Sequence, residues 1–173
     1  MIRHLPAAER VATPWKNGGG VTREVAVFPI GASMDDFLWR ISMAEVTEPG
    51  PFSLFANIDR HLTVLSGSLR LEFSDRSVIL ATGESLTFAG DVPVSGVPLA
   101  PVTDLNVMTR RGQMRADVRR IDGETALQSG LLIVTGAQTV EGHALKPFDA
   151  LMIADETLTA KGLVIAFHEI LRH

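Results

Sequence analysis

Short apolar–polar alternation between closely spaced turn signals is the feature that most constrains how this chain can fold. It is clearest in residues 50–73, GPFSLFANIDRHLTVLSGSLRLEF. The last six residues alternate apolar and polar side chains, and Gly67 marks a turn before them. Alternation with a period of two predicts a half-buried β-strand, and glycine favours the turn. We therefore expect two strands joined as a hairpin around Gly67.

Similar runs recur along most of the sequence, and helical periodicity is weak between them. Turn residues such as glycine, proline and aspartate separate the runs at short intervals. This pattern is typical of an all-β sandwich or barrel. The further strands are expected at residues 21–28, 37–46, 77–81, 85–88, 103–111 and 116–121.

A weak internal repeat suggests that the fold contains two related parts. The similar pairs are LTVLSG at 62–67 with LLIVTG at 131–136, and LATGESLTF at 80–88 with LKPFDALMI at 145–153. A repeat of this kind predicts duplicated structural units. The second part, from about Arg120, has few polar clusters and is interpreted as scaffold.

Composition narrows the class of protein. The 173 residues are 46% hydrophobic and 21% charged, which is ordinary for a globular chain. The net charge of −4 argues against general nucleic-acid binding. The chain has no cysteine, which excludes disulfides, cysteine metal sites and a cysteine nucleophile. We find no signal-peptide pattern and no apolar run of about 18 residues, so we expect a soluble, cytoplasmic protein without a membrane partner.

The histidines give little support for a metal site. They are His4, His61, His143, His168 and His173. No two have the close spacing of H-x-H or H-E-x-x-H, so a bound metal is not expected. We expect no other cofactor either. A G-x-S-x-G nucleophile motif is also absent.

Three polar clusters in apolar surroundings are expected to meet around one pocket. They are WKNGGG at 15–20, DRH at 59–61 and DLNVM at 104–108. Glycine lets a backbone approach a ligand closely, and the Asn17 amide offers both a donor and an acceptor. Trp15 would either stack on a ligand or cover the mouth of the pocket. Asn106 and Met108 would form an apolar-plus-amide wall.

Arg40 and Arg60 are candidates for binding a carboxylate, because the planar guanidinium matches its geometry. The alternative is that each forms a structural ion pair with Asp59, Asp104 or Glu24. His61 is suited to acid–base catalysis near neutral pH, although a lone histidine on a strand is more often structural.

The chain resembles the HutD/Ves family in motifs that occur in the family's order. These are WKNGGGVTRE at 15–24, WRIS at 39–42, GPFS at 50–53, Asp59-Arg60 and DLNVM at 104–108. The resemblance implies a cupin-type fold with two β-barrels in one chain, a bicupin. The N-terminal barrel would span residues 1–119 and hold the pocket, and the smaller C-terminal half would span residues 120–173, both packed as one unit.

The resemblance also implies a function. The family is associated with bacterial histidine utilisation, as a modulator, and its suggested ligand is a small carboxylate such as urocanate or formylglutamate. Metal-dependent cupins carry an H-x-H pair where this chain has RHLT at 60–63, so we expect a metal-free site. The expected ligand-binding residues are Trp15, Asn17, Gly18, Gly19, Thr22, Arg40, Ser42, Arg60, His61, Asn106 and Met108.

Two alternatives stay open. The first is an isomerase or lyase that acts on a small acid with His61 as the base. The second is a structural or protein-interaction module, in which strand edges pair to form a homodimer. Ligand binding without catalysis is preferred, because no complete catalytic constellation stands out in the sequence.

Overall fold

The computed structural model describes residues 1–171, so His173 lies outside the described residues. These residues form β-strands and one short 3-10 helix, Ala7–Glu9, which confirms the all-β expectation. The chain divides into two compact units. The larger is Val11–Gln113, and the smaller combines Met1–Arg10 with the chain from Met114 onward. The smaller unit thus begins before the expected boundary at residue 120 and includes the first ten residues. None of the helical structure in residues 1–171 has the length and apolar character required to cross a membrane.

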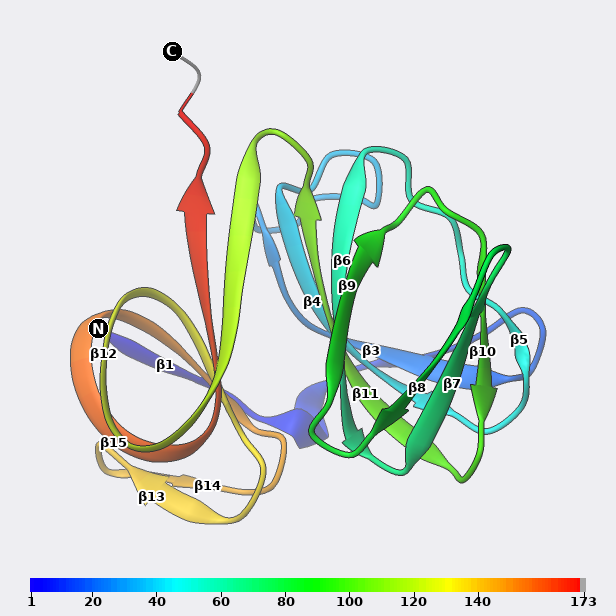
Figure 1. Cartoon of the computed structure of the whole chain (residues 1–173). Coiled ribbons are helices and arrows are strands. Elements are labelled where there is room, and N and C mark those ends of the chain that lie inside the picture. The colour runs from blue at the N-terminus through cyan, green and yellow to red at the C-terminus, as the bar shows by residue number, and fades with distance from the viewer. Residues whose placement is uncertain (172–173) are drawn as a thin grey trace. The chain divides into compact units, whose positions relative to one another are not determined.

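Two antiparallel sheets build the larger unit (Figure 1). The six-stranded sheet runs in the order β2 (Ala12–Pro14), β3 (Gly20–Phe28), β4 (Trp39–Val46), β11 (Val102–Arg110), β6 (Ile58–Ser66) and β9 (Ser85–Ala89). The four-stranded sheet runs in the order β5 (Gly50–Pro51), β10 (Val94–Pro98), β7 (Ser68–Phe73) and β8 (Ser77–Ala81).

The expected hairpin around Gly67 is wrong, because β6 and β7 belong to different sheets. Gly67 has a φ of +82°, and a Cβ there would lie 2.3 Å from the carbonyl oxygen of Pro101. The chain therefore crosses from one sheet to the other at this glycine. Alternation and a turn glycine fit both arrangements, so the local pattern could not separate them.

Alternation places one charged side chain in the inward row of β6. Ile58, Leu62 and Val64 are at most 1% exposed, and Arg60 lies between them at 6%. Leu69 and Leu71 of β7 pack into the same core as Leu62 and Val64. Burial of such leucine and valine side chains contributes about 1.5–3 kcal/mol each. The core thus fixes β6 with its arginine facing inward.

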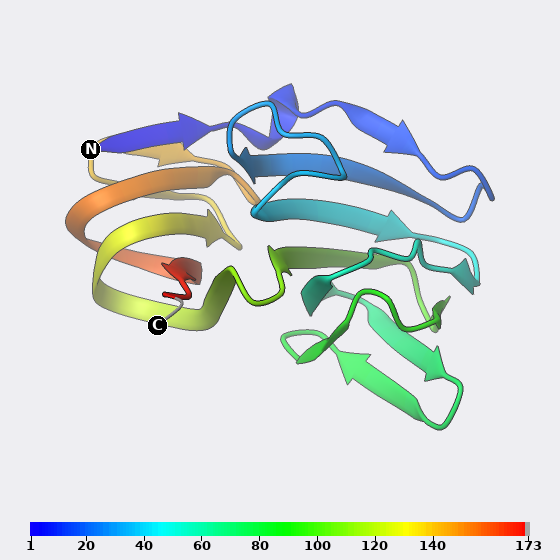
Figure 2. The ribbon, with the colours of Figure 1, turned by 90° about the horizontal axis from the view of Figure 1, so that it is seen from above.

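A coiled two-stranded ribbon dominates the smaller unit (Figure 2). Residues 130–134 of one long strand pair with residues 150–153 along one edge and with residues 162–166 along the other. At Gly130 a Cβ would lie 2.0 Å from the carbonyl oxygen of Ile165, so the close return of the ribbon requires glycine. The strands of this unit are β1 (Ile2–Leu5), β12 (Met114–Val134), β13 (Gln138–Val140), β14 (His143–Leu145) and β15 (Ala150–Glu169).

The weak sequence repeat coincides with a repeated local topology. In the larger unit β6 is followed by the paired strands β7 and β8 and then by β9, which pairs with β6. In the smaller unit the end of β12 is followed by the paired strands β13 and β14 and then by the start of β15, which pairs with β12. The described strands form open sheets, and no closed barrel is found among residues 1–171.

Substitution of Gly67 tests the crossing between the sheets. Gly67→Ala should lower the free energy of unfolding by about 3 kcal/mol or more, because backbone strain adds to the clash with Pro101. Gly112 is the matched control, since it has a φ of +77° and no atom lies within 4 Å of a Cβ built there. Gly112→Ala should cost only about 1 kcal/mol. Urea denaturation measures both, and equal losses would contradict the crossing.

Candidate anion-binding site

A cavity of about 420 Å³ lies in the larger unit against the six-stranded sheet. The antiparallel register turns residues that are distant in sequence into neighbours across this sheet. Three successive rows of the sheet line the cavity. They are Thr22, Ala44 and Asp104, then Ser42 and Asn106, then Arg40, Met108 and Arg60.

Arg60 is the buried cation of this cavity. Its Nε donates to Asn106 Oδ1 and its Nη1 donates to the carbonyl oxygen of Ser53, both over a long 3.4 Å. No carboxylate oxygen in residues 1–171 lies within ion-pair distance of its guanidinium. A buried charge is costly unless it is paired. The guanidinium therefore retains unused capacity to bind an anion.

Aromatic rings partly offset the cost of burying this charge. The Arg60 guanidinium lies 5.2–5.5 Å from the ring centres of Phe52, Phe55 and Phe88. Cation–π contacts of this kind contribute about 0.5–2 kcal/mol each. Burial lowers the pKa of Arg60 to about 10, while the Asp104 carboxyl acts in the opposite direction. Arg60 therefore remains protonated at neutral pH.

Asp104 is the buried acid of the cavity. It is 1% exposed, and its Oδ1 has no hydrogen-bond partner within the described residues. Burial raises the pKa of Asp104 to about 7, and the positive charge of Arg60 opposes this rise. The carboxyl is therefore close to half protonated at neutral pH.

Arg40 lines the cavity but is already paired. Its Nε lies 2.9 Å from Glu24 Oε2. The ion pair with Glu24 that the structural alternative named is therefore present, and ligand binding by Arg40 stays a prediction. Arg40 still contributes a positive field at the cavity, since its charge acts to lower the pKa of Arg60.

Trp15 covers one side of the cavity in a fixed orientation. Its Nε1 donates to Thr22 Oγ1 at 2.7 Å, and its ring meets Phe52 edge-on at 5.9 Å. A Cβ at Gly20 would lie 3.0 Å from the tryptophan ring, so this glycine makes room for it. Asn17 Oδ1 accepts from the Gly19 N–H at 2.9 Å, which uses the amide oxygen inside the loop.

Three expected site residues do not line the cavity, namely Gly18, Gly19 and His61. His61 follows Arg60 on β6 and therefore points to the opposite face of the sheet. There its Nδ1 lies 2.9 Å from Thr87 Oγ1. The expected residues that the structure does bring together are Trp15, Asn17, Thr22, Arg40, Ser42, Arg60, Asn106 and Met108.

The expected set omitted Asp104 and the aromatic cage of Arg60. Strand parity could have revealed Asp104, because it shares a face of β11 with Asn106 and Met108. Phe52 lies in the GPFS motif, so the sequence motif could have indicated it as a site residue. Phe88 gave no local signal, since it meets Arg60 only through the pairing of β9 with β6.

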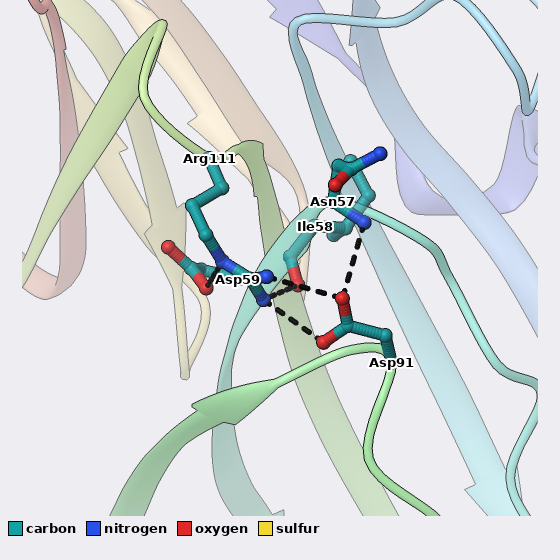
Figure 3. Close-up of polar contacts among 5 residues, drawn as sticks. All are labelled: Asn57, Ile58, Asp59, Asp91 and Arg111. Carbon is teal, nitrogen blue, oxygen red and sulfur yellow. Dashed lines mark hydrogen bonds and ion pairs between the residues drawn. The ribbon is translucent and has the colours of Figure 1, made fainter.

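A cluster centred on Arg111 fixes the start of β6 (Figure 3). Arg111 Nε donates to Asp59 Oδ1 at 2.8 Å, and its Nη2 donates to Asp91 Oδ1 at 3.0 Å and to the Ile58 carbonyl at 3.1 Å. The Asn57 N–H donates to Asp91 Oδ2 at 3.4 Å. These bonds anchor the two residues that directly precede Arg60.

Among residues 1–171, no three histidine, aspartate or glutamate side chains come together in a way that could hold a metal ion. The side chains that line the cavity offer hydrogen bonding and charge from arginine, carboxyl, amide and hydroxyl groups.

Comparison with known proteins assigns the family. The HutD family profile matches residues 7–166. The chain belongs to the HutD family. It is 39% identical over 112 residues to the protein Ves of Citrobacter koseri, which covers 62% of this chain and 58% of Ves. It is 36% identical over 131 residues to an uncharacterized 21.2 kDa protein in the hutC 3′ region of Pseudomonas putida, covering 74% of this chain and 68% of that protein.

The fold is shared with a solved member of the HutD family. HutD from Pseudomonas fluorescens SBW25 superposes with a TM-score of 0.86 at 27% identity, covering 98% of this chain and 99% of that one. The match to Ves, by contrast, spans less than two thirds of Ves.

The pH dependence of stability tests the burial of Asp104. Because the pKa of Asp104 is raised from 3.8 to about 7, the folded protein should lose stability as the pH rises from about 4 to about 7. Asp104→Asn should remove this loss and stabilise the protein above pH 7 by up to about 4 kcal/mol, at about 1.4 kcal/mol per pKa unit. Urea denaturation from pH 4 to 8 measures the free energy of unfolding of both proteins. Asp75→Asn, at an exposed carboxylate, should show no such gain, and a similar gain there would count against the assignment.

The Arg111 cluster should have the opposite effect on a carboxyl pKa, since it lowers the pKa of Asp91 whereas burial raises that of Asp104. Hydrogen bonding to Arg111 lowers the pKa of Asp91 from 3.8 to about 2. The stabilisation from this contact should be present above pH 4 and should disappear as the pH falls towards 2. In Arg111→Gln the Asp91 carboxyl should titrate near its ordinary value, which NMR titration can measure. An unchanged pKa would show that Arg111 is not its cause.

Proposed function

We propose that this HutD-family protein binds a small carboxylate metabolite at Arg60 and thereby modulates bacterial histidine utilisation in the cytoplasm. The observation that carries the proposal is a buried guanidinium that lines a cavity and that no carboxylate oxygen in the described part of the chain approaches within ion-pair distance. A buried charge without a close counter-ion lowers stability, and a ligand carboxylate would supply that counter-ion.

The size and polarity of the cavity support a small ligand. About 420 Å³ lies within the range of small-molecule sites, which are commonly about 300–1,000 Å³. Apolar walls at Phe52, Phe55 and Met108 would cover the ligand's carbon skeleton. Ser42 and Asn106 would offer hydrogen bonds to its polar groups. A molecule of the urocanate or formylglutamate type has this combination of a carboxylate, a short skeleton and further polar atoms.

The link to histidine utilisation rests on the family. HutD-family proteins are associated with histidine-utilisation genes, and the Pseudomonas putida relative is described by its place in the hutC 3′ region. A carboxylate of that pathway is therefore the proposed class of ligand. We further propose that the two units are the halves of a bicupin, which the repeated topology of β6–β9 and β12–β15 supports.

The two alternatives gain no specific support. An isomerase or lyase would need His61 beside the ligand, but His61 lies on the face of β6 opposite to Arg60. A purely structural module would have no use for a buried cation that no carboxylate in residues 1–171 contacts directly. A homodimer formed through strand edges stays a prediction.

Replacing Arg60 tests the proposal. Arg60→Met keeps a long, flexible side chain but removes the charge, so binding should weaken by at least about 100-fold, since losing one partner of a buried charge pair costs about 2–5 kcal/mol. The protein without ligand should become more stable, because the cost of burying a cation that no carboxylate in residues 1–171 contacts directly is removed. Isothermal titration calorimetry with urocanate, formylglutamate, glutarate and formate measures affinity, and thermal unfolding measures stability.

Arg70 provides the matched control. It lies on β7, outside the cavity, in an exposed ion pair with Glu72. Arg70→Met should leave the affinity unchanged. If the Arg60 variant bound these carboxylates as tightly as the parent, or if the parent bound none of them, the proposal would fail.

A further inference from the structure

We propose that a carboxylate ligand enters this cavity together with one proton, which Asp104 takes up, so that the Asp104 hydroxyl donates a hydrogen bond to the ligand. The inference rests on the proposed function and adds a second binding residue to it. Asp104, as a neutral acid, would then donate a hydrogen bond to the ligand. Arg60, as a cation, would pair with the ligand's negative charge.

The sheet places the two groups at a distance that one small ligand can span. Both line the cavity, and β11 pairs with β6 so that Met108 lies opposite Arg60. Asp104 lies four residues from Met108 along β11. The Arg60 side chain extends back to Asn106, midway between them, as its 3.4 Å contact with the amide oxygen shows. The guanidinium is therefore about two residues, or ~7 Å, from Asp104 along the strand.

Charge balance in the cavity is the first reason why Asp104 would take up a proton when the ligand binds. The cations that line it are Arg60 from β6, Arg40 from β4 and Lys16 from the segment before β3. Arg40 is already paired with Glu24, and Lys16 is exposed to solvent. On the strands beside Asp104, the residues opposite it are the apolar Ala44 and Val64.

With Arg40 paired and Lys16 exposed, the buried positive charge of Arg60 can balance one buried negative charge in the cavity. Without a ligand, an ionised Asp104 can fill that role. With a ligand carboxylate next to Arg60, an ionised Asp104 would be a second buried anion, and like charges raise each other's pKa. Uptake of a proton by Asp104 restores the balance.

Hydrogen bonding points in the same direction. Asp104 Oδ1 is buried without a donor among the described residues, which is unfavourable for a carboxylate and much less so for a neutral acid. A protonated carboxyl gains one donor, and a ligand carboxylate supplies the acceptor that this donor needs. The raised pKa of Asp104, about 7 because of its burial, means that the proton is available at neutral pH.

Calorimetry over a range of pH tests the coupling. The probes are N-formyl-L-glutamate and glutarate, whose carboxylates stay ionised from pH 6 to 9. The affinity of the parent protein should fall above pH 7, approaching about tenfold per pH unit, because each binding event then takes up a proton. Titrations at pH 8 in phosphate and in Tris should show an uptake approaching one proton per ligand.

Asp104→Asn keeps the size of the side chain and can donate through its amide. In this variant the affinity should stay nearly constant from pH 6 to 9, and proton uptake should vanish. Asp75→Asn, at an exposed carboxylate away from the cavity, should retain the pH dependence of the parent. Thermal unfolding of both variants confirms that they are folded.

The outcomes separate this inference from the proposed function. If the ligands bind through Arg60 but the parent's affinity does not change with pH, or if Asp104→Asn keeps the parent's slope, proton coupling is wrong and the proposed function stands. If neither ligand binds the parent or the Asp104→Asn protein at any pH, the proposed function itself is wrong, and this inference is wrong with it.

Discussion

Much of the larger unit can be understood from the cost of burying one guanidinium. Arg60 occupies a position in the inward row of β6 that apolar side chains fill on either side. Three phenylalanine rings and two long hydrogen bonds offset part of that cost. The Arg111 cluster holds the strand start directly before it. The side chain is thus held in place by its surroundings while its charge remains available.

Antiparallel pairing is what converts separate sequence motifs into one site. The segments around Thr22, Ser42, Arg60 and Asn106 come from four adjacent strands, whose order in the sheet, β3-β4-β11-β6, differs from their order in the chain. Because a strand alternates faces, only every second residue of each motif reaches the cavity. The same rule places Arg60 inside and His61 on the other face.

The two units share a local topology, but the smaller unit has no counterpart of Arg60 at the matching strand position. When residues 131–136 are aligned with residues 62–67, Ser129 takes the position of Arg60. The core of the smaller unit is built from aliphatic side chains such as Leu132, Val134 and Leu151. Its glycines instead allow the long β12–β15 ribbon to coil back on itself. The two repeats therefore share a strand topology, and the matching position of the smaller unit lacks the charged residue of the binding site.

The sequence by itself determined the all-β class, most strand positions and most of the cavity lining, because alternation and turn residues are local signals. It also carried the family motifs. Only the tertiary structure decided that β6 and β7 lie in different sheets and that Phe88 faces Arg60. It also decided that Arg40 has an ion-pair partner, while Arg60 has none among residues 1–171. These facts depend on which strands pair and in what register, and pairing is set by long-range packing that no local window of sequence contains.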